Sequence, residues 1–335
     1  MARVVVAPDK FRGTATAAEL VEAVLQAARA AGWEATGVPM ADGGEGTLDV
    51  FGGPNRVSTV TGPLGDPVDA EWRLDRRRAV IEMARASGLA LVGGAEGNDP
   101  VAASTFGTGE LISAAIDAGA RRILVGLGGS ASTDGGLGAL RALPPPPRLR
   151  GLDLVVACDV RTAFVDAAEV FAPQKGATPA QVELLGRRLE RLVEVYRDEY
   201  GIDVAGLVHG GAAGGLGGGL AAVGATLVDG FELISEEVGL PEAMEDADLV
   251  VTGEGHLDGE SFDGKVVGGV TSLAAELGVP CLVVVGSVDP DLDRSHLEGF
   301  DVVDLTASVG EHAARTETCT HVAAAVTERL GRSIA

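Results

Sequence analysis

Short runs of β-branched and apolar residues recur along the chain, and each is followed by a turn and then by a helical pattern. Residues 3–7 predict a strand, and residues 15–31 predict a helix. Thr14 or Thr16 would be the N-cap of this helix, and Gly32 would end it. Fully apolar strands that alternate with helices indicate a parallel sheet with both faces covered.

The two ends of the sequence combine into one predicted domain. Further strands are expected at residues 34–39, 249–252, 280–285 and 302–306, and further helices at residues 266–277 and 312–330. Together with the first strand and helix they predict a flavodoxin-like five-stranded parallel sheet with strand order 2-1-3-4-5. This domain is discontinuous and comprises residues 1–55 plus 244–335.

Residues 56–243 then form a second, dissimilar α/β domain that is inserted into the first. Its strands are expected at residues 79–83, 122–126 and 152–157, and its helices at residues 109–118 and 181–200. The uncharged stretch 204–228 is long enough to span a bilayer. Because nine of its residues are glycine, we expect a ligand loop that runs into a tightly packed helix instead.

Charge and cysteine content narrow the class of function. The 335 residues carry a formal net charge of −23, which argues against binding to nucleic acid or to an anionic membrane. Three cysteines are too few for a disulfide framework, so we expect a reducing compartment, the cytoplasm. A homodimer is compatible with the sequence, which does not fix the oligomeric state.

Lysine is rare in this chain. The 26 basic residues comprise 23 arginines and only Lys10, Lys175 and Lys265. GC-rich codon usage accounts for the depletion, but the remaining lysines are then enriched at sites that need a compact ammonium group. All three fall in the motifs described next, and we predict that they converge on one cleft.

Two charged turns follow the first two expected strands, where open α/β sheets bind ligands. The first turn carries Asp9, Lys10 and Arg12 and is either an anion site or a charged surface turn. The second carries Asp42 and Glu45 among three glycines. These two acids are either ligands for Mg²⁺ or a helix-capping pair, with Asp42 as the N-cap.

Small and polar residues fill the segment 126–136, which follows another strand. Its glycine N–H groups and hydroxyls suit an anion nest, with Asp134 as a metal contact; the candidates are Gly128, Gly129, Ser130, Ser132 and Thr133. Asp159 ends the next strand, and Lys175 stands in a turn before a helix. Cys158 is expected to be a buried apolar residue and not a nucleophile.

Two more glycine-rich segments lie towards the C-terminus. The first contains Gly214 and Gly215, followed by a relaxed dinucleotide fingerprint at residues 217–222, a weak signal in so glycine-rich a chain. The second, residues 252–266, contains Glu254, Asp258, Gly264 and Lys265. It resembles a P-loop but lacks the final hydroxyl residue, so we expect a phosphate-binding helix N-terminus with its own lysine. His256 is expected to be a hydrogen-bonding residue.

These motifs together resemble the glycerate kinases of the bacterial class I type. The resemblance rests on APDKFRGT, MADGGEGT, IEMARASGL, GLGGSASTDGG, PQKGA, AAGGLGGGL and TGEGHLDGESFDGK, and it covers nearly the whole chain. It implies ATP- and Mg²⁺-dependent phosphorylation of D-glycerate, with 2-phosphoglycerate favoured as the product. It also implies two α/β domains that face each other across a cleft.

Roles follow from the resemblance and from the motifs. Those expected to be catalytic are Asp9, Lys10, Asp134 and Asp258; those for substrate binding are Arg12, Asp42, Glu45, Lys175 and Glu254. Phosphate and nucleotide binding is assigned to Gly128, Gly129, Ser130, Ser132, Thr133, Gly214, Gly215, Gly264 and Lys265, and metal binding to Asp134 and Asp159.

The chain also departs from the family pattern. Arg161 stands in a segment where the family has a DNPL-like sequence, and His256 replaces an arginine. These departures motivate one alternative, a kinase-derived binding protein without activity or with altered specificity for a small hydroxy acid. The glycine fingerprint at residues 217–222 motivates another, a nucleotide-dependent oxidoreductase.

Overall fold

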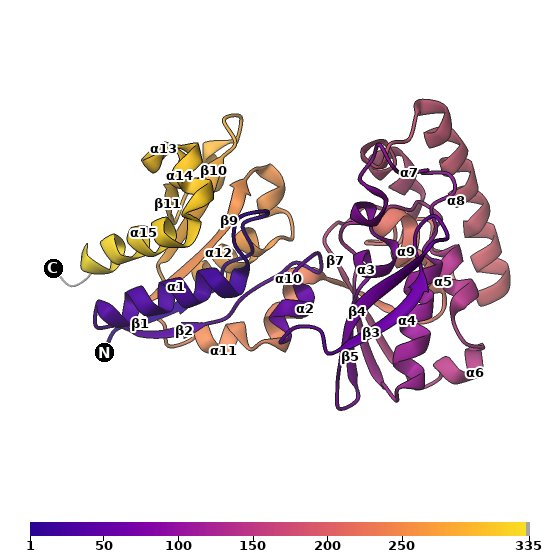
Figure 1. Ribbon diagram of the computed structural model, residues 1–335, viewed down its shortest axis with the longest axis horizontal. Coiled ribbons are helices and arrows are strands. Elements are labelled where there is room, and N and C mark those ends of the chain that lie inside the picture. Colours follow the sequence, from indigo (N-terminus) through magenta and orange to yellow (C-terminus); the bar gives the residue numbers. More distant parts are fainter. Residues whose placement is uncertain (333–335) are drawn as a thin grey trace. The chain divides into compact units, whose positions relative to one another are not determined.

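The computed structural model describes residues 1–332 and divides the chain into two compact units (Figure 1). Unit 1 comprises Met1–Asp42 and Phe231–Ala335, and unit 2 comprises Gly43–Gly230. The sequence analysis places the divisions later, at 55/56 and 243/244. The first division differs because the turn after Gly43 and the short helix that follows it are held by unit 2.

Unit 1 contains a five-stranded sheet in which every strand pairing is parallel. Its strands are β1 (Arg3–Val6), β2 (Glu34–Gly37), β9 (Leu249–Leu257), β10 (Cys281–Val288) and β11 (Asp301–Asp304). They lie in the order β2-β1-β9-β10-β11. This is the expected 2-1-3-4-5 order, so the predicted flavodoxin-like sheet is confirmed.

Helices cover this sheet because its strands are apolar on both faces. Helices α1 (Ala17–Ala30) and α15 (Thr318–Arg332) lie side by side and share a hydrophobic core with Val4, Val251 and Val284 (Figure 1). Helix α12 (Val266–Leu277) packs on β9 and β10. The alternate strand positions are buried as well, and this doubly buried pattern is characteristic of parallel sheets.

Helix boundaries in unit 1 follow local capping. Thr16, not Thr14, is the N-cap of α1 and forms a capping box with Glu19. The expected terminal helix at 312–330 is two helices, α14 (Glu311–Thr316) and α15, because Glu317 leaves the helical conformation. The remaining helices are α10 (Gly230–Glu237), α11 (Leu240–Met244) and α13 (Leu305–Val309).

Unit 2 contains a mixed six-stranded sheet in the order β3-β4-β5-β6-β7-β8. The strands are β3 (Arg56–Thr61), β4 (Pro67–Asp75), β5 (Arg78–Glu82), β6 (Arg122–Gly126), β7 (Asp153–Cys158) and β8 (Thr226–Asp229). The pairs β3–β4 and β4–β5 are antiparallel, and the others are parallel. Strands β3, β4 and β8 were not predicted from the sequence. The first two are only partly buried and therefore lack a continuous apolar run.

Four helices of unit 2 frame its polar loops: α4 (Phe106–Asp117), α5 (Leu137–Ala142), α8 (Pro179–Tyr200) and α9 (Ala212–Ala222). Short helices complete the unit: α2 (Thr47–Val50), α3 (Ala84–Ser87), α6 (Pro146–Leu149) and α7 (Ala167–Phe171). The uncharged stretch 204–228 forms α9 and β8, with a left-handed kink at Ala213–Gly215. Within residues 1–332, no helix combines the length and hydropathy needed to cross a membrane.

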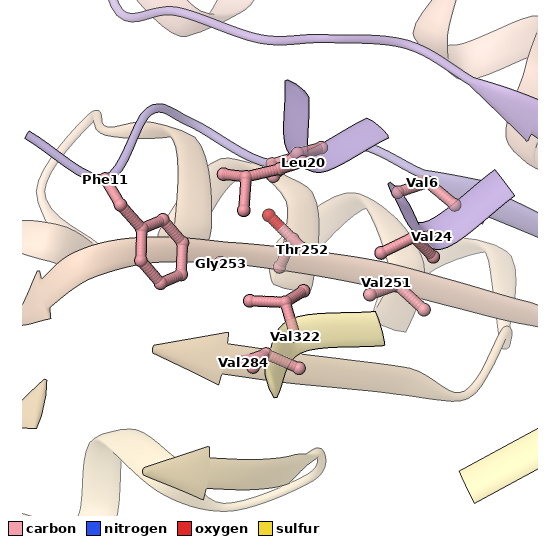
Figure 2. A pocket seen from close by; sticks show the side chains of 10 residues that line it. Val6, Phe11, Leu20, Val24, Val251, Thr252, Gly253, Val284 and Val322 are labelled. Carbon is pink, nitrogen blue, oxygen red and sulfur yellow. The ribbon is translucent and has the colours of Figure 1, made fainter. Parts of the chain in front are cut away.

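A small apolar cavity of about 10 Å³ lies in the core of unit 1. Figure 2 shows the side chains that line it, from the strands, the turn after β1, α1 and α15: Val6, Phe11, Leu20, Val24, Val251, Thr252, Val284 and Val322. The Thr252 hydroxyl donates to the carbonyl of Ala7 and therefore needs no water partner. The cavity has room for about one water molecule, so the core below the strand ends is closely packed.

Leu20 carries much of the contact between α1 and the sheet, because its side chain is fully buried in this core. We expect Leu20→Ala to lower the free energy of unfolding by about 2–5 kcal/mol through lost burial and a larger cavity. Leu25→Ala is the matched control on the same helix; Leu25 is partly buried, so its loss should be smaller. Urea denaturation followed by circular dichroism measures both, and equal losses would contradict this account.

Candidate active site

The carboxyl ends of β1 and β9 bring the first charged turn of unit 1 against the sheet. The backbone N–H of Asp9 donates to the carbonyl of Gly253 at 2.9 Å, and that of Ala7 donates to Val251 at 2.7 Å. The pairing of the two strands therefore continues past the end of β1. As a result the Asp9 side chain is only 13% exposed.

Burial raises the pKa of Asp9 to about 6, because the charged carboxylate loses solvent there. Lys10 opposes this shift: its Nζ lies 3.8 Å from Asp9 Oδ1, and its backbone N–H donates to the same oxygen at 2.7 Å. The Asp42 carboxylate adds to the increase. A carboxyl group with a pKa near neutrality can accept a proton and release it at physiological pH.

Glu254 is a second buried acid at the same edge. Burial raises the pKa of Glu254 to about 7, and the neighbouring Asp9 carboxylate contributes to the increase. Its Oε1 atom is buried without a hydrogen-bond partner. A buried carboxyl oxygen without a partner is costly, so this atom is a natural contact for a bound ligand.

Lys265 occupies the N-cap position of α12, and its Nζ pairs with Glu260 Oε2 at 3.0 Å. Burial disfavours the ammonium, but the hydrogen bond and charge of Glu260 outweigh that effect, and the pKa of Lys265 is raised. Asp258 and Asp42 act in the same direction. Lys265 therefore stays charged at neutral pH, at the positive end of a helix dipole.

The other predicted residues of unit 1 have distinct surroundings. Asp258 caps a short 3₁₀ turn by accepting from the backbone N–H and the hydroxyl of Ser261. Arg12 is exposed. Gly264 has a positive φ of 79° in the turn that ends at Lys265.

His256 lies between two polar side chains of the adjacent strand and the turn after it. Its Nδ1 is 2.9 Å from Ser287 Oγ, and its Nε2 is 3.6 Å from Asp289 Oδ2. These neighbours agree with the expected hydrogen-bonding role.

The Gly/Ser loop of unit 2 is organised around a buried lysine. Lys175 is 2% exposed, and its Nζ donates to Ser130 Oγ at 2.8 Å and to the Ser132 carbonyl at 2.6 Å. Burial lowers the pKa of Lys175 to about 7, although the carboxylates of Asp134 and Asp159 act in the opposite direction. The ammonium thus links the turn that contains Lys175 to the Gly/Ser loop, which is distant in sequence.

Two hydroxyls of this loop are buried and unsatisfied. Ser132 Oγ and Thr133 Oγ1 have no hydrogen-bond partner. Gly128 and Gly129 precede them at the end of β6, and Gly128 approaches Gly44 so closely that a Cβ would lie 2.5 Å from its Cα. The loop therefore combines small residues with two buried hydroxyls that lack a partner, and the anion nest stays a prediction.

Asp134 is engaged within unit 2. Its carboxylate accepts from the backbone N–H groups of Thr105, Gly136 and Gly138 and from the hydroxyls of Thr105 and Ser104. These five donors fix α4 and α5 to the loop. The structure thus gives Asp134 an architectural role beside the predicted catalytic and metal-binding ones.

Gly214 and Gly215 pack against that same loop. A Cβ on Gly214 would lie 2.1 Å from the Ser132 carbonyl oxygen, so only glycine permits the contact. The fingerprint residues Gly217 and Gly219 lie inside α9 and do not form a strand-to-helix turn. This placement removes the structural basis for a dinucleotide site.

The proposed capping pair Asp42–Glu45 is wrong. Helix α2 begins after Gly46, which makes no side-chain cap, and Glu45 is exposed. The sequence analysis missed Glu82, whose Oε1 accepts from the N–H groups of Gly46 at 3.0 Å and Leu48 at 2.9 Å. Its position as the acid at the end of an apolar strand, three residues before Arg85, was the available signal.

The predicted residues thus form two sets. Unit 1 holds Asp9, Lys10, Arg12, Asp42, Glu254, Asp258, Gly264 and Lys265; unit 2 holds Glu45, Gly128, Gly129, Ser130, Ser132, Thr133, Asp134, Asp159, Lys175, Gly214 and Gly215. The convergence of the three lysines and the cleft between two domains stay predictions. In residues 1–332, no cluster of three or more His, Cys, Asp or Glu residues could hold a metal ion.

Buried acids, lysines and a Gly/Ser loop lie at strand ends, which is where open α/β sheets bind their ligands. The glycerate kinase family model matches residues 4–145 and 144–335. Glycerate 2-kinase of Escherichia coli (strain K12) is 37% identical over 92% of this chain and 91% of its own. Glycerate kinase of Halalkalibacterium halodurans is 38% identical over 90% of each chain.

A crystal structure from Salmonella typhimurium LT2, described as that of a candidate glycerate kinase 2, shares the fold. It has a TM-score of 0.81 and 33% identity and covers 99% of both chains. The chain therefore belongs to the glycerate kinase family and is an enzyme of the kinase class.

Lys175 makes a pH-dependent contribution to stability. Its pKa is about 7 in the folded chain, below the ordinary lysine value of 10.5, so between these two values the unfolded chain binds more protons. The contribution of Lys175 to the free energy of unfolding is therefore fully present above the pKa of the unfolded chain. It is lost as the pH falls through the folded pKa of about 7. We expect the free energy of unfolding of the wild type, relative to Lys175→Met, to rise between pH 7 and 10 by a few kcal/mol.

Denaturant unfolding of both chains across this pH range measures the effect. Lys265→Met is the control, because the pKa of Lys265 is raised and its side chain stays protonated over the same range. If the difference in the free energy of unfolding between the wild type and Lys175→Met does not change with pH, the lowered pKa of buried Lys175 is contradicted.

Proposed function

We propose that this chain catalyses the ATP-dependent phosphorylation of D-glycerate, with Mg²⁺, to 2-phosphoglycerate. Family membership and the names of its relatives support the reaction class. The observation that carries the proposal is Asp9, a buried carboxyl group with a pKa of about 6 beside Lys10 at the carboxyl edge of a parallel sheet. The three cysteines are free, which suits a reducing cytoplasm.

Asp9 is the proposed general base. It would accept the proton of the glycerate hydroxyl as that oxygen attacks the γ-phosphorus, and the bond from phosphorus to the ADP oxygen would break. Asp134 and Asp258, the other acids ranked for this role, already accept several hydrogen bonds within the fold. Asp9 is therefore the candidate whose carboxyl is both buried and poised near neutrality.

The positive groups near Asp9 suit an anionic substrate in a strongly acidic protein. Lys10 and Arg12 belong to the same turn, and Lys265 is a charged helix N-cap in the same unit. Lys10 and Arg12 would bind the glycerate carboxylate, and Lys265 would bind phosphate. Together these charges would offset repulsion from a chain of net charge −23. The unpartnered Oε1 of Glu254 would accept from a substrate hydroxyl.

The Gly/Ser loop of unit 2 is the proposed contact for phosphate oxygens. Ser132 and Thr133 supply unpartnered hydroxyls, and Lys175 holds the loop in place. Residues 1–332 contain no cluster of three or more potential metal ligands, so Mg²⁺ would have few protein ligands here. Such a site is common for Mg²⁺, which often uses one or two carboxylates together with phosphate oxygens. Asp134 and Asp159 are the predicted carboxylate contacts, and the oxygens of Asp134 also accept hydrogen bonds within unit 2. When bound, the ion would neutralise phosphate charge.

Asp9→Asn tests the base. We expect kcat to fall by a factor of about 10²–10⁴ while the affinity for ATP stays near that of the wild type. The kcat/KM of the wild type should fall as the pH falls through about 6, because a general base must be deprotonated to act. This decrease at acidic pH should be absent in Asp9→Asn. A coupled assay of ADP release with D-glycerate measures these quantities.

Asp263→Asn is the matched control, because Asp263 is an exposed acid in the turn before α12. Asp134→Asn and Asp258→Asn are assayed in parallel. Near wild-type turnover in Asp9→Asn would show that the base lies elsewhere. Binding of D-glycerate by the wild type without any turnover would favour the non-catalytic binding protein.

The position of the new phosphate is tested separately. The Escherichia coli relative is named a glycerate 2-kinase, and we expect 2-phosphoglycerate here. Phosphorus NMR of the reaction mixture, spiked in turn with each authentic phosphoglycerate, identifies the product. Co-resonance with 3-phosphoglycerate would overturn the regiochemistry while leaving the kinase activity intact.

A further inference from the structure

Unit 2 contains a cavity of about 440 Å³ between α8 and the loop after β6. One part of its wall is apolar and is formed by Val101, Ala103, Leu137, Leu184 and Leu192. The rest is polar and is formed by Thr133, Asp134, Arg187, Arg188 and Arg191. The volume lies in the range of sites for small ligands that combine an apolar body with a few polar groups.

Helical periodicity produces this mixed wall. Residues 184, 187, 188, 191 and 192 are spaced three or four apart along α8, so they share one face of the helix. The face therefore carries three arginines flanked by two leucines. Three guanidinium groups around one cavity are a positive cluster on a strongly acidic protein, and arginine suits phosphate through its fork of donors.

The arginines have partners in the free protein but keep spare donors. Arg187 pairs with Glu183 at 3.8 Å, Arg191 with Glu194, and Arg188 donates to the Val101 carbonyl at 3.0 Å. Each guanidinium has five N–H donors, so a phosphate can be bound without loss of these contacts. Their exposure makes the present ion pairs weak.

Thr133 gives a second, independent indication of a ligand. It lines the cavity, is 1% exposed, and its hydroxyl has no hydrogen-bond partner. The adjacent Ser132 carbonyl accepts from the Lys175 ammonium, which places a buried cation behind this part of the wall. Asp134 also lines the cavity, but its carboxylate oxygens accept from five donors in Ser104, Thr105, Gly136 and Gly138.

We propose that this cavity binds the nucleotide of the kinase reaction, with the base against the leucines and the phosphates at the arginines. The inference rests on the proposed function, which supplies two ligands. D-Glycerate is a small, wholly polar acid and would leave the apolar wall unfilled. A nucleotide combines a flat base with several anionic groups and matches both parts of the wall.

Calorimetric titration of the full chain with ADP tests the site without turnover. Arg187→Gln and Arg191→Gln should each raise the Kd for ADP about ten-fold or more, because each removes a charge-assisted contact to phosphate. Binding of adenosine, which lacks phosphate, should change far less. Leu184→Ala should weaken the binding of both ligands.

Arg197→Gln is the matched control. Arg197 lies on the same helix and pairs with Asp203 at 2.6 Å, and it does not line the cavity. Its Kd for ADP should stay within about two-fold of the wild type. Unchanged ADP binding in Arg187→Gln and Arg191→Gln, or an equal loss in the control, would overturn the assignment.

Turnover with D-glycerate separates this inference from the proposed function. Arginine-dependent binding of ADP in a chain that never phosphorylates D-glycerate would support the cavity and refute the reaction. Phosphorylation of D-glycerate with a KM for ATP that the arginine variants leave unchanged would refute the cavity and leave the reaction standing. A raised KM for ATP with an unchanged KM for D-glycerate supports both.

Discussion

The backbone hydrogen bond from Asp9 to Gly253 is the contact on which the site of unit 1 depends. It continues the pairing of β1 and β9 beyond the regular strand and keeps the charged turn against the sheet. The carboxyl group therefore lies where solvent is scarce, and desolvation raises its pKa towards neutrality. The same edge carries Glu254, so two acids share a region that favours their neutral forms.

Unit 2 uses the opposite arrangement, a buried cation that organises polar loops. Lys175 joins its own turn to the Gly/Ser loop through Ser130 and Ser132, and Asp134 ties that loop to α4 and α5. The glycines at 214 and 215 let a second backbone approach the loop closely. Much of the polar sequence in this unit therefore maintains a rigid platform, and Ser132 and Thr133 are the members left with unused hydroxyls.

The sheet of unit 1 could be predicted because its strands are continuous apolar runs separated by clear helical patterns. The helix 266–277 and the strand 122–126 were predicted with the bounds that the structure gives. The antiparallel strands β3 and β4 could not be found in this way, since their polar alternation lacks a strong signal. Family membership was visible in the order and spacing of the motifs.

By itself, the sequence determined the fold class and the strand order of unit 1, because these follow from local periodicity. The placement of glycines, acids and lysines marked the turns that hold the candidate functional residues. Tertiary structure alone decided which polar groups have hydrogen-bond partners and which buried polar groups lack them. Asp134 and Thr133 are neighbours in sequence, yet one accepts five hydrogen bonds and the other accepts none. Burial and partners arise from segments far apart in the chain, and no local pattern encodes them.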